Sequence, residues 1–214
     1  EYSLAAHPDT ESTSTTHFSV VDGDRNMVSI TSTIELLFGS AMVVPGRGFL
    51  LNNELTDFSS RPEDADGNPI ANAPTGERAE RRTALGDDAE TVGGKRPRSS
   101  MAPTLVLRDG EPFMALGSPG GSRIIGYNLN VLLHVIDFDM ELQEAINVGR
   151  VVARNGTVTI DSDILTPTIL GGLEARGFSV SEGNTGSVQA VQVGDDGLVY
   201  GAADPRRNGL ALGH

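Results

Sequence analysis

The amino-acid sequence predicts an α+β protein in which antiparallel strands and helices occupy different parts of the chain. Alternating apolar residues around Gly, Asp and Asn turns predict β-hairpins near both ends. Helical periodicity is concentrated between these hairpins. Because strands and helices do not alternate regularly, the pattern favours a layered antiparallel fold over a βαβ one. We see no internal repeat and no domain boundary.

The first predicted hairpin lies in "HFSVVDGDRNMVSITST", residues 17–33, directly after the hydroxyl cluster "STSTT". Such a cluster is commonly a loop that hydrogen-bonds its own backbone, although one of its hydroxyls could instead be a nucleophile. A short apolar strand is predicted in "GFLL", residues 48–51, followed by a polar loop. Residues 61–94 are charged and lack periodicity, which is typical of a lid-like or disordered surface loop.

A second hairpin is predicted in "APTLVLRDGEPFMALGS", with Asp109-Gly110 at its turn. The Gly-rich stretch "GSPGGS" then opens into an apolar periodic segment, which predicts a buried helix over residues 122–136. The next segment, "DMELQEAINV", predicts a second helix capped by Asp139.

The last third of the chain alternates turn and helix signals. "RVVARNGTVTID" predicts a hairpin around Asn155-Gly156. In "TPTILGGLEARG", Thr166 is expected to be the N-cap, Pro167 the first helical residue and Gly177 the C-cap. A final hairpin is predicted in "SVQAVQVGDDGLVYGAA", with its turn at residues 195–197.

Composition excludes several classes of protein. The 214 residues carry 29 acidic against 16 basic side chains, a net charge of −13, so nucleic acid would be repelled. Cysteine is absent, which excludes disulfides and thiol chemistry. No apolar run is long enough to span a membrane. The acidic, Pro-containing start "EYSLAAHPDTES" resembles neither a signal peptide nor a domain start, so we expect the sequence to begin inside a longer product.

Metal and nucleotide sites are poorly supported by the residues. The four histidines, His7, His17, His134 and His214, form no ligand spacing. "DADGN" at residues 64–68 matches only half of a calcium loop, because the later ligands are missing. "GSPGGS" lacks the Lys-Ser/Thr of a phosphate loop. Its small residues stand at the start of a helix and leave backbone N–H groups available, which is what an oxyanion hole requires. The alternative is a plain tight turn. We expect no metal and no cofactor.

Five blocks together resemble the small subunit of γ-glutamyltranspeptidases, in the family's order and with similar spacing. They are "TTHFSVVD", "GFLLNNELTDFSS", "GGKRPRSSMAPTLVLRDG", "GSPGGSRII" and "LVYGAADPRR". The resemblance implies an N-terminal nucleophile (Ntn) hydrolase with an αββα four-layer sandwich, completed by a large subunit outside this chain. Residues 1–14 would be a segment before the cleavage site and residues 15–214 the small catalytic subunit, with the loop at 61–94 over its site.

The resemblance also implies catalytic roles. The precursor would cut itself before Thr15, and the released α-amine of Thr15, a group whose ordinary pKa is about 7.7–8.0, would then activate its own hydroxyl. Thr33 would lie beside Thr15 and hydrogen-bond that hydroxyl. The N–H groups of Gly120 and Gly121 would stabilise the tetrahedral oxyanion.

Substrate-binding residues carry over in the same way. Ser99 and Ser100 match the pair that holds the substrate α-carboxylate, while Glu54 and Asp57 match the groups that hold its α-amino group. Glu35 departs from the family, because many members have Asn at its position near the α-carboxylate, and a carboxylate there would repel the substrate or change its protonation. The "PRFH"-like family segment is replaced by "VGRVVARNG".

The resulting hypothesis is a γ-glutamyltransferase or glutathione hydrolase with a γ-glutamyl ester intermediate that water, an amino acid or a peptide resolves. Two alternatives stay open: a related glutaryl- or cephalosporin-type acylase, and an unprocessed, inactive relative. The expected partners are the large subunit of the same precursor, γ-glutamyl compounds such as glutathione, and an amino-acid or peptide acceptor. Resemblance to bacterial members implies a periplasmic or secreted location.

Overall fold

The computed structural model describes residues 14–61, 63–68, 70, 72–73, 96–154, 156–183 and 186–213. The described residues divide into two compact units, one holding residues 34–73 and 96–99 and the other holding residues 14–33 and 100–213. The expected division into a segment of residues 1–14 and a subunit of residues 15–214 stays a prediction. No helix among the described residues is long and apolar enough to cross a membrane.

The second unit begins with the predicted first hairpin, formed by β1 (Thr15–Val21) and β2 (Met27–Thr33). The strands pair antiparallel with Thr15 opposite Thr33 and Val21 opposite Met27. The turn is held by the Asp22 carboxylate, which accepts hydrogen bonds from the backbone N–H groups of Asp24 and Asn26. This Asx-type turn sets the register of the whole hairpin.

A four-stranded antiparallel sheet contains the second and the last of the predicted hairpins. Its strand order is β3-β4-β8-β9, with bounds Thr104–Arg108, Glu111–Gly117, Gln189–Val193 and Val199–Ala203. Asp109 and Gly110 both have positive φ, as a tight hairpin turn between β3 and β4 requires. β1 and β2 pack on this sheet, and the Ser29 hydroxyl donates to the Leu116 carbonyl at 2.9 Å.

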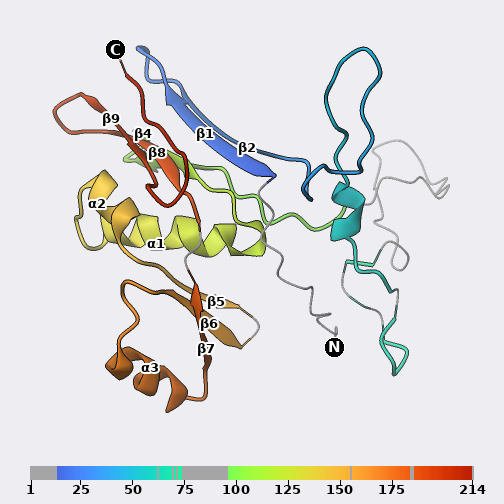
Figure 1. Cartoon of the computed structure of the whole chain (residues 1–214). Coiled ribbons are helices and arrows are strands. Elements are labelled where there is room, and N and C mark those ends of the chain that lie inside the picture. The colour runs from blue at the N-terminus through green and yellow to red at the C-terminus, as the bar shows by residue number, and fades with distance from the viewer. Residues whose placement is uncertain are drawn as a thin grey trace, which may run out of the picture. The chain divides into compact units, whose positions relative to one another are not determined.

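Two helices cover the sheet. α1 (Ile124–Ile136) follows the 3-10 turn η2 (Gly121–Arg123), as predicted, and α2 (Leu142–Asn147) packs against α1 and β9. Apolar side chains of α1, α2 and the sheet form the core, which includes Phe113, Met114, Leu116, Tyr127, Val131, Leu142, Ile146 and Val188. Figure 1 shows the hairpin and the sheet on one side of α1 and α2. This stacking supplies β, β and α layers of the predicted sandwich.

The predicted cap of α2 is wrong. Glu141, not Asp139, directly precedes the helix. Asp139 has a φ of 52°, whereas an N-cap residue takes a β-region conformation, so its side chain is not placed to cap the first turn. The intervening residues instead close the end of α1, where the Met140 N–H donates to the His134 carbonyl at 3.0 Å.

A third sheet lies on the far side of α1, with β5 (Val151–Arg154), β6 (Thr157–Asp161) and β7 (Ser179–Gly183) (Figure 1). β5 and β6 form the predicted antiparallel pair, but β6 and β7 pair parallel. α3 (Pro167–Glu174) connects them, so the expectation of antiparallel pairing throughout is wrong for this β6-α3-β7 unit. The strand β7 reads "SVSEG", which has too few apolar residues to predict a strand.

The ends of α3 agree with the sequence. The Thr166 hydroxyl accepts a hydrogen bond from the Ile169 N–H at 3.2 Å, and Pro167 is the first helical residue. Gly177 has a φ of 86° and its N–H donates to the Glu174 carbonyl, which ends the helix in the left-handed conformation typical of glycine.

The first unit contains little regular structure among its described residues. It has the 3-10 turn η1 (Glu54–Asp57) and one isolated bridge between Val43 and Leu50. The strand predicted at residues 48–51 is therefore wrong, because positive φ at Gly46 and Gly48 bends the chain back on itself before Leu50. Most of the predicted loop at 61–94 lies outside the described residues.

Candidate active site

Thr15 and Thr33 form a pair of hydroxyls at the open end of the first hairpin. They are opposite one another in the register of β1 and β2, and their Oγ1 atoms are 2.9 Å apart. The hydrogen bond predicted between them is present. Both side chains are half-buried, so Thr33 can orient the Thr15 hydroxyl without sealing it from a reactant. Because Ser14 precedes Thr15, the α-amine of Thr15 becomes available only when that peptide bond is cut.

His17, two residues after Thr15, is a buried histidine on the face of β1 that carries Thr15. Its Nδ1 lies 2.8 Å from Thr31 Oγ1 and its Nε2 lies 2.9 Å from Ser19 Oγ. A Cβ atom added to Gly117 would overlap the His17 ring, so the ring packs directly on the end of β4. The sequence predicts no role for this histidine, because the four histidines form no metal-ligand spacing. In the structure it fastens the hairpin to the sheet.

Burial lowers the pKa of His17 to about 4. The imidazole is therefore neutral at neutral pH, and its two hydroxyl partners satisfy one donor and one acceptor nitrogen. The described residues contain no group of three or more His, Asp or Glu side chains arranged to hold a metal ion.

We expect the stability of the protein to fall in acid because of His17. The folded pKa of about 4 is below the unfolded value of 6.5, so the contribution of neutral His17 is fully present above pH 6.5 and is lost toward pH 4. The loss amounts to about 3 kcal/mol at most. Urea unfolding at several pH values measures it. His17→Gln should remove this part of the pH slope; a variant with the unchanged slope would contradict the assignment.

Gly120 is the last residue of the turn between β4 and η2, and Gly121 is the first residue of η2. Their φ angles of 137° and 55° are in the region that favours glycine. A Cβ atom on Gly120 would lie 2.5 Å from the Tyr127 Cε2 atom, so the backbone of this turn rests on the Tyr127 ring. The two N–H groups therefore lie at the start of the η2-α1 helical segment, where backbone donors lack helical partners and favour negative charge.

A cavity of about 340 Å³ borders both elements. Thr15 and Pro119, the residue before Gly120, line it together with side chains of β8 and β9 and the segment 207–212. The candidate nucleophile and the residue that precedes the glycine turn thus border the same cavity within the second unit.

The first unit brings three carboxylates together. Burial raises the pKa of Glu54, and the nearby negative charges of Asp57 and Glu35 raise it further. Glu35 accepts hydrogen bonds from the Asn53 amide and, at 2.8 Å, from the Thr56 hydroxyl. The three acidic residues predicted to bind substrate therefore form one negatively charged cluster around η1, suited to a cationic group.

The two predicted carboxylate-binding serines lie where the chain passes from the first unit to the second. Ser99 ends the first unit and Ser100 begins the second. The chain before Ser99 is held to η1 by Asn72, whose Oδ1 accepts from the Arg98 N–H at 2.8 Å and whose Nδ2 donates to the Asp57 carbonyl. The Asn72 side chain thus connects the backbone of Asp57 to the chain just before Ser99. The catalytic and binding roles of all these residues stay predictions.

Comparison with known proteins identifies the family. The layered sheets, the strand-initial threonine and the glycine turn define the Ntn-hydrolase class, and solved structures agree. Gamma-glutamyltranspeptidase from Pseudomonas nitroreducens complexed with L-DON aligns with a TM-score of 0.75 and 37% identity, over 93% of this chain and 99% of that chain. The family model for gamma-glutamyltranspeptidase matches residues 1–214. The chain belongs to the γ-glutamyltranspeptidase family.

Curated relatives include two kinds of proenzyme. The glutathione hydrolase proenzyme of Escherichia coli is 40% identical over 200 residues, which is 92% of this chain and 32% of the relative. The acylase ACY 1 proenzyme of a Pseudomonas species is 34% identical over 204 residues, which is 94% of this chain and 32% of the relative. Cephalosporin acylase from Bacillus halodurans aligns with a TM-score of 0.73 and 25% identity, over 92% of this chain and 34% of that one. The chain spans about a third of the length of these curated relatives.

Proposed function

We propose that this chain is the small catalytic subunit of a γ-glutamyltransferase or glutathione hydrolase, released from its precursor by cleavage before Thr15. The observation that carries the proposal is the hydrogen-bonded pair of Thr15 and Thr33 at the start of β1. The γ-glutamyltranspeptidases and glutathione hydrolase proenzymes among its relatives support it.

Cleavage and catalysis use the same nucleophile in this proposal. In the precursor, Thr15 Oγ1 attacks the Ser14 carbonyl carbon, and the peptide C–N bond breaks as the nitrogen takes the hydroxyl proton, which frees the Thr15 amine. Water then hydrolyses the resulting ester to give the Ser14 carboxylate and restore the Thr15 hydroxyl. In turnover, this amine takes the hydroxyl proton while Oγ1 attacks the γ-carbonyl of the substrate. The departing amine receives the proton, and water or an acceptor amine then resolves the γ-glutamyl ester.

Two groups of residues in the chain have charges complementary to this substrate, one for the oxyanion that forms at the γ-carbonyl and one for the α-ammonium group. The N–H groups of Gly120 and Gly121 would receive the oxyanion, and each such donor is typically worth about 10²–10³ in rate. The acidic cluster around η1 would hold the α-ammonium group by charge-assisted hydrogen bonds. Burial and then the negative charges of Asp57 and Glu35 raise the pKa of Glu54, and a bound cation would offset that repulsion.

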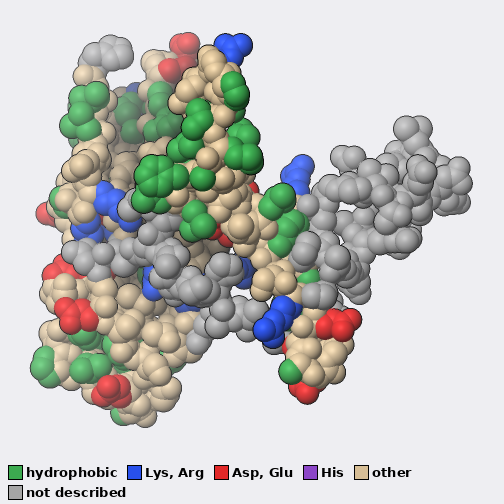
Figure 2. Space-filling view, turned by 45° about the vertical axis from the view of Figure 1, so that its right-hand side comes forward, with side chains coloured by type: hydrophobic (Ala, Val, Ile, Leu, Met, Phe, Trp, Pro, Cys, Tyr) green, Lys and Arg blue, Asp and Glu red, His purple; other side chains and the backbone are tan. Residues whose placement is uncertain are grey.

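A large subunit is the partner that we propose for this chain. The hairpin exposes Phe18, Val20, Val28 and Ile30 on the face turned away from the sheet, each more than 40% accessible. Figure 2 shows hydrophobic side chains exposed at the upper part of the molecule, where the hairpin lies. Contiguous apolar surface of this kind marks an interface. Its occupant would come from the two thirds of the relatives' length that this chain does not span.

A matched pair of substrates tests the proposal. The whole precursor is incubated at neutral pH, its mass is checked for cleavage at Ser14–Thr15, and the product is given γ-glutamyl-p-nitroanilide and glutaryl-p-nitroanilide. These anilides differ only in the α-amine, so the proposed function requires cleavage and faster release of nitroaniline from the γ-glutamyl compound. A preference for the glutaryl compound would favour the acylase alternative that the ACY 1 relatives represent. An uncut, inactive precursor would favour the unprocessed relative.

Asp57→Ala is expected to remove most of the discrimination between these anilides. Losing a charge-assisted partner of the α-ammonium should raise KM for the γ-glutamyl compound at least about 10-fold, since such bonds contribute about 1.5–3 kcal/mol. The glutaryl compound, which lacks the ammonium group, should be hydrolysed as before. Steady-state kinetics on both substrates measure the change. Unaltered γ-glutamyl kinetics would remove Asp57 from the site.

A further inference from the structure

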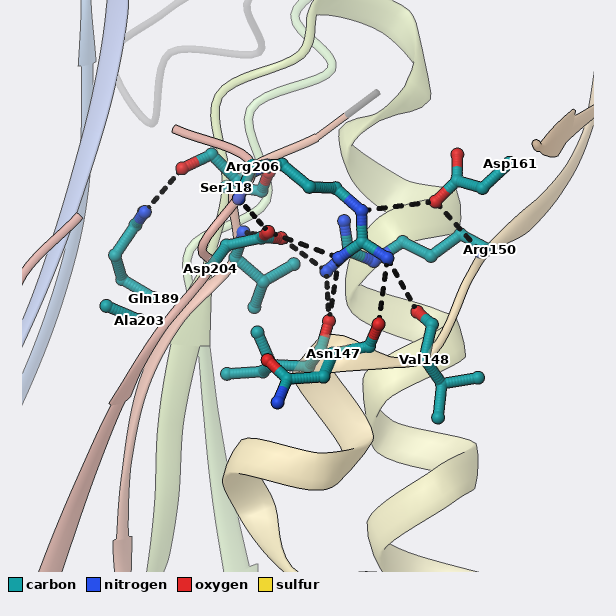
Figure 3. A network of polar contacts seen from close by, with 12 residues as sticks. Ser118, Asn147, Val148, Arg150, Asp161, Gln189, Ala203, Asp204 and Arg206 are labelled. Carbon is teal, nitrogen blue, oxygen red and sulfur yellow. Dashed lines mark hydrogen bonds and ion pairs between the residues drawn. The ribbon is translucent and has the colours of Figure 1, made fainter. Parts of the chain in front are cut away.

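A buried network of charges lies beneath the glycine turn. Arg150 Nη2 and Asp204 Oδ2 are 2.5 Å apart, and the two side chains are 1% and 0% exposed. Arg206 joins them, with its Nη1 3.2 Å from Asp204 Oδ1 and its Nε 3.5 Å from Asp161 Oδ2. Figure 3 shows the Arg206 guanidinium between Asp161, Asp204 and the carbonyl groups at the end of α2. Four segments of chain therefore meet in one buried cluster.

The network is well provided with hydrogen bonds. Asp204 also accepts from the backbone N–H groups of Val188 and Arg206, and Arg206 donates to the carbonyls of Ile146, Asn147 and Val148. Buried ion pairs with this many hydrogen-bond partners favour a single arrangement of the surrounding backbone, because any other backbone arrangement would leave a buried charge unpaired. The positions of β9 and of the C-terminal end of α2 are fixed together.

Several contacts connect this cluster to the glycine turn. The Arg150 guanidinium lies 5.7 Å from the centre of the Tyr127 ring, and Gly120 rests on the same ring. A Cβ atom on Gly186 would lie 2.8 Å from Arg150 Nη1 and 3.0 Å from Tyr127 Cδ2, so Gly186 closes the remaining side. In addition, the Ser187 N–H donates to Ser118 Oγ at 3.3 Å, two residues before Gly120.

We propose that the Arg150–Asp204 pair is a positioning element for the Gly120–Gly121 turn and that Tyr127 transmits its effect. The inference deepens the proposed function and rests on it, because the position of the turn affects the rate only if its N–H groups bind the oxyanion. Tyr127 is fully buried and surrounded by Gly120, Gly186 and Arg150, so it cannot move without moving the turn. Oxyanion donors act over hydrogen-bond distances, and a displacement of about 1 Å can cost about 10²-fold in rate.

The test compares three variants of the whole precursor. Tyr127→Leu removes the ring under Gly120, and Asp204→Asn keeps its volume but removes the charge that holds Arg150. Val131→Ala is the matched control, because Val131 is equally buried one turn further along α1, whereas the ring on which Gly120 rests belongs to Tyr127. For each, kcat and KM with γ-glutamyl-p-nitroanilide are measured below the unfolding temperature, together with amide hydrogen exchange across residues 118–123.

Tyr127→Leu should lower kcat about 10- to 100-fold with KM within about twofold, because the substrate-holding residues are unchanged. Exchange at residues 118–123 should become faster, and Asp204→Asn should act in the same direction. Val131→Ala should change neither quantity. If Tyr127→Leu does not fold, the kcat, KM and amide exchange of the isosteric Asp204→Asn variant test the inference instead.

Wild-type kcat and exchange in the folded variants, or an equal loss in Val131→Ala, would overturn the inference. A wild-type precursor without γ-glutamyl turnover would contradict the proposed function instead. The exchange measurement would then still report on the positioning, since it needs no activity.

Discussion

Thr15→Ala is expected to abolish both precursor cleavage and γ-glutamyl turnover. Removing the Oγ1 atom leaves neither reaction with a nucleophile, and losing the nucleophile of an acyl-transfer enzyme costs at least about 10⁴-fold in kcat. Intact mass after incubation at neutral pH measures cleavage, and release of nitroaniline measures turnover. The variant should remain a single uncut chain.

Two further variants separate the chemistry from folding. Thr15→Ser keeps a hydroxyl and should still cut, but more slowly, since a serine side chain is held less firmly than the β-branched threonine. Thr33→Val keeps the shape and removes the hydroxyl that lies 2.9 Å from Thr15 Oγ1, so it should slow both steps without stopping them. Cleavage of Thr15→Ala at the wild-type rate would place the nucleophile elsewhere.

Asp204→Ala is expected to produce a large loss of stability, about 3–5 kcal/mol in the free energy of unfolding. The substitution leaves the Arg150 guanidinium, 1% exposed, without this carboxylate and also withdraws a partner from Arg206. Urea unfolding of the uncut Thr15→Ala chain, followed by circular dichroism, measures the change without interference from cleavage.

Asp195→Ala is the matched control for this loss. Asp195 pairs with Arg108 at 3.4 Å, but the two side chains are 95% and 51% exposed. Exposed pairs contribute about 0–1 kcal/mol, so this variant should be nearly neutral. The double variant Arg150→Met with Asp204→Ala should recover part of the stability, because it removes both charges of the buried pair together. Equal costs for Asp195→Ala and Asp204→Ala would show that the buried pair is not the stabilising element.

Local signals were sufficient to predict most of the fold. The Asp109-Gly110 turn, the Gly-rich entry to α1 and the Thr166-Pro167 start of α3 each depend on conformational preferences of a few neighbouring residues. The register that pairs Thr15 with Thr33 follows in the same way, because the turn at residues 22–26 sets it. Two features that the sequence does not predict depend instead on distant partners.

The parallel pairing of β6 with β7 is one example, since nothing in "SVSEG" indicates which strand it joins. The buried Arg150–Asp204 pair is another. Arginine and aspartate are usually exposed, and only the tertiary structure brings the side chains of residues 150 and 204 within 2.5 Å. For the candidate site, the roles of Thr15 and the glycine turn came from family resemblance, whereas the contacts of His17 and Tyr127 needed the structure.

The alternation of the first hairpin constrains how this region can evolve. Thr15, His17 and Ser19 share one face with their partners on β2, while Phe18 and Val20 take the other. A residue inserted within either strand would exchange the two faces from that point on, turning hydroxyls outward and phenylalanine toward the sheet. Length variation among homologues should therefore be confined to the turn at residues 22–26, and an alignment gap inside either strand would signal a misaligned sequence or a lost site.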